Sequence, residues 1–357
     1  MAADEQSNGA PAAAEAWRLG RAAYEAASYG DAVRLLSKAV AADGKQAGAW
    51  VDLGSARWRR GDRDGAIAAW KRATAEDPSR ARAWHNLSTA LLSAGRWGEA
   101  AEAATKAVTV DPRRAKAWNN LAVARERLSD VVGAETALRR AVEADPGFGI
   151  AWGNLGTALL RRGAHTEAEA AFLRAIDGRH DDASCRLGLA RAMAARGARD
   201  EGEAMLLAAA KAAPNSVDLW LGLGDLRRER GLAAGALDAF EHAGAAATDL
   251  PDGVRADVAR RRRLAALDLL HDAIGARDRS AAVAALARAR AAGVGEPAAS
   301  GDDVSLAQSL RRCVAAAEHA GAVEVPATWV ETAVRDALGL PRAAVASQAG
   351  TPPTERA

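Results

Sequence analysis

Asparagine side chains recur at a fixed spacing in the first half of the chain. Asn86, Asn120 and Asn154 are 34 residues apart, in the segments AWHNL, AWNNL and AWGNL, and Asp52 lies one step before them. An amide side chain carries both a donor and an acceptor, so it can pair with a peptide backbone of any sequence. This spacing therefore favours backbone recognition, and the alternative is that each amide bonds a neighbouring turn of its own chain.

Catalytic chemistry finds little support in the sequence. No H-E-x-x-H, nucleophile elbow, P-loop or glycine-rich dinucleotide fingerprint is present, and no nucleophile is paired with a base. Cys185 and Cys313 match no metal or redox spacing, and we interpret them as buried or idle thiols, which suit a reducing compartment. We therefore expect no catalytic residue, no metal and no cofactor. The six histidines are scattered, at His85, His165, His180, His242, His271 and His319.

The asparagines belong to a larger repeat of 34 residues, typified by residues 47–80. Counted from Ala47 as position 1, position 7 is leucine in seven consecutive repeats and position 27 is alanine in all seven. Position 4 is tryptophan in five of them, and a period of this size indicates a solenoid. These tryptophans are Trp50, Trp84, Trp118, Trp152 and Trp220, and we expect them to be structural core residues rather than stacking platforms for a ligand.

Each repeat reads as two antiparallel helices. Apolar residues fall at helical spacing in both halves, and Gly61-Asp62 separates them, since glycine supplies the positive φ that follows a helix end. Pro78 lacks an N–H group and ends the second helix. Small residues such as Gly54 allow close backbone approach beside large ones such as Trp70. One repeat cannot bury its apolar face alone, so stacked repeats must share a core.

The unit resembles the tetratricopeptide repeat family. The matching residues are the W-x-x-L-G segment of residues 50–54, Ala66, Trp70, Ala73 and the Asp77-Pro78 pair. The resemblance implies an all-α, right-handed α-solenoid whose first helices line a concave groove. It covers seven repeats, at residues 13–46, 47–80, 81–114, 115–148, 149–182, 183–216 and 217–250.

Departures from the pattern are concentrated in the outer repeats. The first repeat has Trp17 one place late and Gly44 where proline is usual, the sixth has Arg186 in place of the aromatic residue, and the seventh has Thr248 in place of proline.

The resemblance also implies that positions 2, 5, 6, 9, 12 and 13 face the groove. Arginine and lysine outnumber acidic residues there, and an arginine fork suits carboxylates, so we expect an extended, acidic or carboxylate-bearing peptide segment as ligand. The alternative is that these are solvated helix charges. The two-carboxylate clamp of the family, Lys at position 5 with Asn at position 9, matches no repeat. The candidate peptide-binding residues are Asp52, Trp58, Arg59, Arg82, His85, Asn86, Lys116, Asn119, Asn120, Arg127, Asn154, Arg161 and Arg191.

Outside the repeats the chain falls into four segments. Residues 1–12 read as a disordered N-terminus, 251–294 as a degenerate eighth helical pair, 295–340 as C-terminal capping helices and 341–357 as a disordered tail. The densest charge, residues 260–263 (RRRR), lies in a predicted helix, and we interpret it as a solvated face, with an acidic-partner patch as the alternative.

Composition narrows the class of function. The net charge of +2 gives no general attraction to nucleic acid or membrane, and no signal peptide or membrane span is evident, so we expect a cytoplasmic protein. We predict a protein–protein interaction scaffold and not an enzyme. Two alternatives stay open: a substrate-presenting or targeting subunit of an enzyme complex, docked through residues 254–340, and a scaffold that self-assembles end to end as a homo-oligomer.

Overall fold

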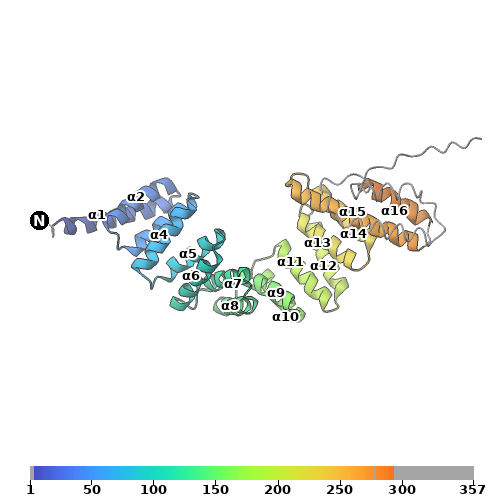
Figure 1. Cartoon of the computed structure of the whole chain (residues 1–357), viewed down its shortest axis with the longest axis horizontal. Helices are drawn as coiled ribbons and strands as arrows, with labels where there is room; N and C mark the ends of the chain where they lie inside the picture. Colours follow the sequence, from blue (N-terminus) through green and yellow to red (C-terminus); the bar gives the residue numbers. More distant parts are fainter. Residues whose placement is uncertain (1–3, 277–278, 293–357) are drawn as a thin grey trace, which may run out of the picture. The chain divides into compact units, whose positions relative to one another are not determined.

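The computed structural model describes residues 4–276 and 279–292, and all regular secondary structure in these ranges is α-helical (Figure 1). The chain forms two compact bodies, Met1–Gly197 and Ala198–Ala357. The division falls inside the sixth repeat, in the turn between its two helices. The predicted all-α architecture of successive helix pairs is confirmed.

The helices follow the chain in order. In the N-terminal body they are α1 (Asp4–Glu25), α2 (Tyr29–Ala42), α3 (Ala47–Arg59), α4 (Arg63–Glu76), α5 (Ala81–Ser93), α6 (Trp97–Val110), α7 (Ala115–Arg127), α8 (Val131–Ala144), α9 (Gly149–Arg162), α10 (His165–Asp177) and α11 (Ala183–Ala195). In the C-terminal body they are α12 (Arg199–Ala212), α13 (Val217–Glu229), α14 (Ala233–Ala246), α15 (Asp252–Gly275) and α16 (Arg279–Ala291).

The helix boundaries keep the register of the repeat. From α3 to α13 each first helix begins at position 1 of its repeat, and α4 ends two residues before Pro78. One boundary differs, because α1 begins at Asp4, so residues 4–12 are helical where disorder is expected. The segment continues without a break into the alanine-rich residues 12–16, which favour a helix, and Pro11 lies in the interior of α1.

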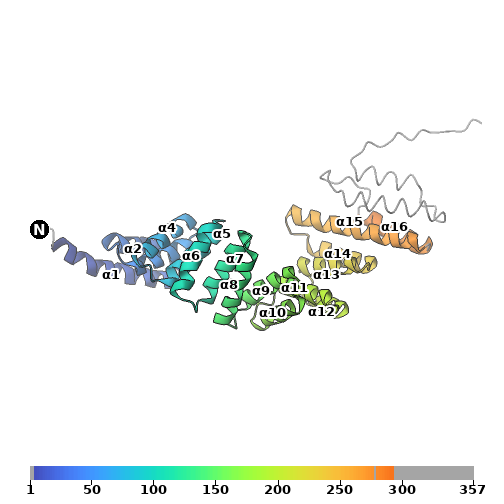
Figure 2. The ribbon, with the colours of Figure 1, turned by 60° about the horizontal axis from the view of Figure 1, so that its bottom comes forward.

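Large and small side chains alternate between the two helices of a repeat. Gly54 on α3 faces Trp70 on α4, and a Cβ atom added at Gly54 would lie 2.6 Å from Trp70 Nε1. Trp70 is 4% exposed, and its indole N–H donates to Val51 O at 3.1 Å. The glycines and large residues of the sequence pattern therefore interlock as expected, and Figure 2 shows the helix pairs that they join, such as α5–α6 and α7–α8.

Within residues 4–276 and 279–292, no further helix covers the outer side of the first repeat. Leu53, at position 7 of the second repeat, is fully buried against the first repeat, whereas Leu19, at the same position of the first, is 40% exposed. Position 3, a buried alanine in the next repeats, is Glu15 here, which pairs with Arg18 at 2.6 Å. Burying this ion pair would cost free energy, so it opposes end-to-end stacking, and self-assembly remains a hypothesis.

The turn between the two helices requires a positive φ angle at position 15. Glycine occupies this position at Gly61, Gly95, Gly163, Gly197 and Gly231. Two repeats carry a different residue, Ala27 with a φ of 58° and Ser129 with a φ of 65°. Non-glycine residues are strained in this region of conformational space, so these two turns store unfavourable backbone energy.

Replacing Ala27 with glycine is expected to stabilise the first repeat. Relief of the left-handed conformation is worth about 1–2 kcal/mol, and the greater freedom of glycine in the unfolded chain offsets about 0.5–1 kcal/mol of that. The net gain is therefore about 0.5–1 kcal/mol in the free energy of unfolding, measured by urea titration. Gly61→Ala is the matched reverse change, and the explanation by turn strain is wrong if both variants shift stability in the same direction.

The tryptophans at position 4 tie each repeat to the preceding linker. Their indole N–H groups donate to a backbone carbonyl six residues earlier, at 2.8–2.9 Å in all five cases. Four of these side chains are half-buried and Trp220 is buried. Their role is therefore structural, as predicted, although most of them keep an exposed edge. The acceptors are Gly44, Pro78, Pro112, Pro146 and Pro214.

The eighth helical pair packs on the seventh repeat. Phe240 of α14, Leu264 and Leu267 of α15, and Ala289 of α16 share one core cluster. Of residues 260–263 the first is exposed and the other three are half-buried, and Arg261 pairs with Asp225 and Asp257 of its own body. The predicted capping helices at 295–340 and the tail at 341–357 lie outside the described residues.

Candidate functional site

The first helices of successive repeats form a shared face in the N-terminal body. Besides packing on its own partner, α1 contacts α3, α5 contacts α7, and α9 contacts both α7 and α11. Side chains at the groove positions of these helices therefore lie next to one another across repeat boundaries. This face is where the sequence analysis places the candidate ligand-binding residues.

A cavity of about 260 Å³ opens on this face between the first three repeats. It brings together five of the candidate residues from α3 and α5, which the sequence separates by up to 28 positions. Those five are Trp58, Arg59, Arg82, His85 and Asn86.

Two aromatic residues in the cavity were not among the sequence candidates. Tyr24 comes from α1 and Trp70 from α4. The Trp58 and Trp70 rings are 6.0 Å apart at an interplanar angle of 46°. The repeat pattern predicts Trp70 as a core residue, and it is buried, yet it also contributes to the lining of the cavity. The cavity thus has an aromatic wall that the groove positions alone do not reveal.

Two arginines, Arg59 and Arg82, line the cavity, and two further cations act on His85 from nearby. Arg82 and Lys116 are exposed, and neither forms an ion pair among the described residues. Burial lowers the pKa of His85, and the positive charges of Arg114 and Lys116 lower it further, while a hydrogen bond with Asn86 acts in the opposite direction. His85 therefore experiences a positive electrostatic field, and the same field favours a negatively charged ligand group.

The polar residues at position 6 bond the preceding repeat. Asp52 accepts the indole N–H of Trp17 at 2.8 Å. The amide nitrogen of Asn120 donates to Ser88 Oγ at 3.0 Å and to Thr89 Oγ1 at 2.8 Å.

One repeat further on, Asn154 donates to Asn119 Oδ1 at 2.8 Å. The donors and acceptors of these side chains are thus engaged in hydrogen bonds between repeats. This agrees with the alternative interpretation, in which each amide bonds a neighbouring turn of its own chain. Asn86 differs, because it lines the cavity.

The arginines at position 13 also reach back to the preceding repeat. Arg59 lies over the Tyr29 ring at 5.5 Å, and Arg127 lies over the Trp97 ring at 5.4 Å. Arg161 donates to Glu126 at 2.6 Å. Each contact joins neighbouring repeats at the turn end of their helices, so these cations are engaged within the fold and only Arg59 also lines the cavity.

Arg191, the remaining candidate, is exposed on α11 and does not line this cavity.

A family model described as the C-terminal domain of cilia and flagella-associated protein 70, a tetratricopeptide repeat domain, matches residues 49–264, which is more than half of the chain. The chain belongs to the tetratricopeptide repeat family. No curated protein matches the sequence significantly.

Two solved structures share the fold of this tetratricopeptide repeat protein. PilF of Pseudomonas aeruginosa is 19% identical over 59% of this chain and 96% of its own, with a TM-score of 0.52. A tetratricopeptide repeat protein of Parabacteroides merdae is 14% identical over 71% of this chain and 99% of its own, with a TM-score of 0.53. Among the described residues no helix is both long and apolar enough to cross a membrane.

Proposed function

We propose that this protein is an interaction scaffold that holds an extended, acidic segment of a partner protein on the face formed by its first helices. The observation that carries the proposal is the cavity between the first three repeats, with aromatic side chains on its wall and cations around it. An aromatic pocket supplies an anchor for one apolar side chain, and the cations select acidic neighbours in the same segment.

The size of the cavity supports a peptide side chain as its occupant. At about 260 Å³ it is smaller than the roughly 300–1,000 Å³ of typical small-molecule and cofactor sites. It is also open toward the shared face of the first helices, so a chain that places one side chain in the cavity can continue along neighbouring repeats. The proposal is therefore a linear segment with one large apolar residue flanked by carboxylates.

A selection from a random peptide library displayed on phage tests this function directly on the full chain. Selected peptides are expected to carry Asp or Glu beside one aromatic or large aliphatic residue. Their synthetic, fluorescein-labelled forms are expected to bind Arg82→Glu about tenfold more weakly, because the change reverses a charge beside the cavity. Arg113→Glu makes the same change at an exposed linker residue and serves as the matched control.

Two results of that experiment contradict the proposal. One is a selection that yields no acidic peptides. The other is an equal loss of affinity in Arg82→Glu and Arg113→Glu, which would indicate attraction to net charge rather than to this site.

Two asparagines at the same repeat position are expected to respond differently to the same substitution. Asn86→Ala removes a hydrogen-bonding group from the cavity and is expected to weaken a selected peptide about fivefold, equivalent to roughly 1 kcal/mol, with little change in stability. Asn120→Ala removes two bonds to the preceding repeat and is expected to cost about 1 kcal/mol of folding stability with affinity unchanged. Fluorescence anisotropy and urea unfolding measure the two effects, and equal behaviour of the variants would contradict this division of roles.

A further inference from the structure

The junction between the fifth and sixth repeats differs from its neighbours. Tryptophan at position 4 donates to the linker carbonyl at the five junctions that carry it, whereas this junction has Arg186 at that position. The acceptor position is His180, in place of the proline found at four of those junctions. The indole bond that holds the linker elsewhere is therefore absent at this junction, and Arg186 instead donates to the two carboxylate oxygens of Asp181 in the linker, both at 2.6 Å.

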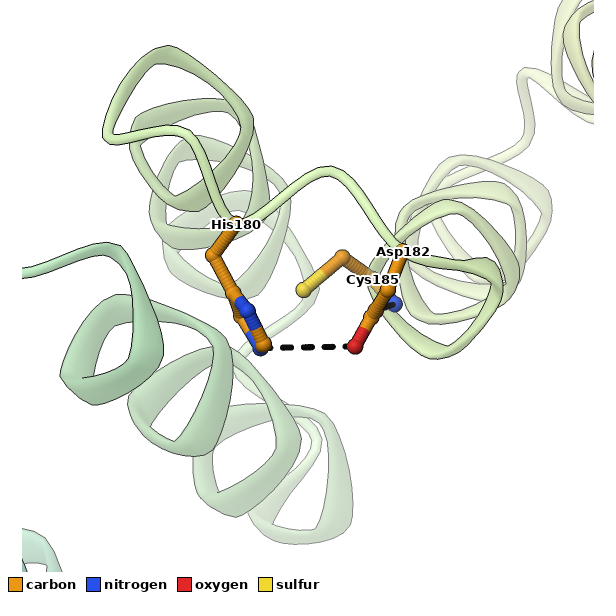
Figure 3. A group of neighbouring side chains, drawn as sticks. All are labelled: His180, Asp182 and Cys185. Atoms are coloured by element: carbon orange, nitrogen blue, oxygen red, sulfur yellow. Dashed lines mark hydrogen bonds and ion pairs between the residues drawn. The ribbon is translucent and has the colours of Figure 1, made fainter. Parts of the chain in front are cut away.

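Three side chains of different chemistry converge at this junction. His180, Asp182 and Cys185 each offer one ligand atom, and these atoms all lie within 4.8 Å of one another (Figure 3). His180 lies in the linker between α10 and α11, Asp182 directly precedes α11, and Cys185 is in the first turn of α11. All three belong to the N-terminal body.

The two carboxylate oxygens of Asp182 have different partners. Its Oδ1 accepts the backbone N–H of Cys185 at 2.8 Å and caps α11. Its Oδ2 lies 3.5 Å from His180 Nε2 (Figure 3). The cap fixes the carboxylate on the helix, so the second oxygen is held beside the imidazole.

The preceding repeat leaves room for this cluster. A Cβ atom added at Gly153 of α9 would lie 3.0 Å from Cys185 Sγ and 3.1 Å from His180 Cδ2. Position 5, which Gly153 occupies, carries Val51, His85 and Asn119 in the three repeats before it. A side chain of that size would displace the thiol and the imidazole, so glycine here keeps both in place.

Nucleophilic chemistry does not account for the cluster. Cys185 is 3% exposed, and burial together with the adjacent carboxylates raises the pKa of its thiol to about 12. A buried thiol is inaccessible to a substrate, whereas reactive cysteines are exposed.

We propose that His180, Asp182 and Cys185 bind a divalent cation of the zinc class through the imidazole nitrogen, one carboxylate oxygen and the thiolate. Imidazole, carboxylate and thiolate are the ligands that Zn²⁺ takes in proteins, and three protein ligands leave a fourth tetrahedral position for water. Binding transfers the thiol proton of Cys185 to solvent, and the two anionic ligands balance the charge of the cation. The ligand atoms must contract to separations of about 3.3–3.6 Å, a small movement for a linker residue such as His180.

The bound cation would stabilise the junction between the fifth and sixth repeats. A cation at this place bonds His180 of the linker to the first turn of α11, and so adds a second bond beside the ion pair of Arg186 with Asp181. This inference is independent of the proposed peptide site, because the two share no residue.

Zinc binding to the untagged full chain tests the site. Cys313→Ser serves as the parent, so that Cys185 is the only thiol in the protein. Calorimetric titration with ZnCl₂ is expected to show that one equivalent of Zn²⁺ binds. Repeating the titration in buffers of different ionisation enthalpy is expected to show that one proton is released. Cobalt(II) is expected to bind the same site and give a thiolate-to-cobalt charge-transfer absorption band.

Variants of the three ligands then separate this site from adventitious binding. Cys185→Ala and His180→Asn are each expected to weaken Zn²⁺ by more than about tenfold, since even outer-shell partners of a metal are worth that much. Asp182→Asn keeps an oxygen for the helix cap while it removes the charge, so it should lower affinity without unfolding α11, which circular dichroism checks. Absence of stoichiometric binding in the parent, or affinity and a cobalt band that survive Cys185→Ala, overturns the proposal.

Discussion

Gly54→Ala is expected to lower the free energy of unfolding by about 2 kcal/mol, although alanine is the better helix former. Helix propensity favours the change by about 1 kcal/mol. Against this, the new methyl group would lie 2.6 Å from the indole of Trp70, and overpacking of this kind costs about 1–3 kcal/mol. Moving the indole also breaks its buried hydrogen bond to Val51, a further loss of about 1–3 kcal/mol. The packing terms therefore outweigh propensity.

Two further variants isolate that cause. Gly98→Ala changes another helical glycine, but a Cβ atom there has nothing within 4 Å, so this variant should be neutral or slightly stabilised. The double variant Gly54→Ala/Trp70→Leu should lose less stability than the two single changes predict together, because the smaller side chain makes room for the methyl group. Urea unfolding followed by circular dichroism measures all of them. A Gly54→Ala variant as stable as Gly98→Ala would refute the interlocking of these helices.

Trp58→Ala is expected to weaken a peptide selected on the full chain by about 30-fold, equivalent to roughly 2 kcal/mol of binding free energy. Trp58 is half-buried and lines the cavity beside Trp70, so it offers a desolvated aromatic surface of the kind that dominates interface energies. Anisotropy titration of the labelled peptide measures the loss. The effect should exceed that of Arg82→Glu, since the exposed charge mainly changes the rate of association.

The control for this prediction is another tryptophan outside the cavity. Trp97 begins α6 and lies under Arg127, so Trp97→Ala removes a comparable ring without touching the site. Trp58→Phe should retain most of the affinity, because the smaller aromatic ring still lines the cavity and can contact the peptide. If Trp58→Ala and Trp97→Ala bind the peptide equally well, the anchor role of Trp58 is wrong.

The sequence was sufficient to predict features that depend on the repeat itself. The pattern around Trp50, Gly61 and Pro78 sets where helices begin and end, because each of these residues acts on its own turn of chain. The pairing of Gly54 with Trp70 was also predictable, since both recur at fixed positions. Such features depend on short-range geometry that every repeat shares.

Contacts between repeats were harder to predict. Arg59 and Arg127 were assigned to the groove from their position, yet each stacks on an aromatic ring of the preceding repeat. A long side chain can point into the groove or toward the preceding repeat. Which orientation it takes depends on the residues that the preceding repeat places within its reach. The same holds for Asn120 and its two hydroxyl acceptors.

The grouping of His180 with Cys185 was missed for the opposite reason. In the sequence His180 is one of six scattered histidines, and Cys185 matches no metal spacing, so nothing in the linear motifs joins the two. A signal was present in the sequence, because the usual proline and tryptophan are both replaced at one junction, at His180 and Arg186.

The bonds from tryptophan to the linker have a spectroscopic consequence. An indole whose N–H group is fixed to a backbone carbonyl changes its fluorescence when that carbonyl moves away, so each tryptophan at position 4 reports the opening of its own junction. The emission of a chain that keeps one of these five tryptophans, minus that of a chain that keeps none of them, would isolate one junction from the other five tryptophans of the protein and so resolve the order in which the junctions open. The junction at Arg186 has no such reporter. If unfolding begins at this junction, the ellipticity measured by circular dichroism would fall before the tryptophan emission maximum shifts.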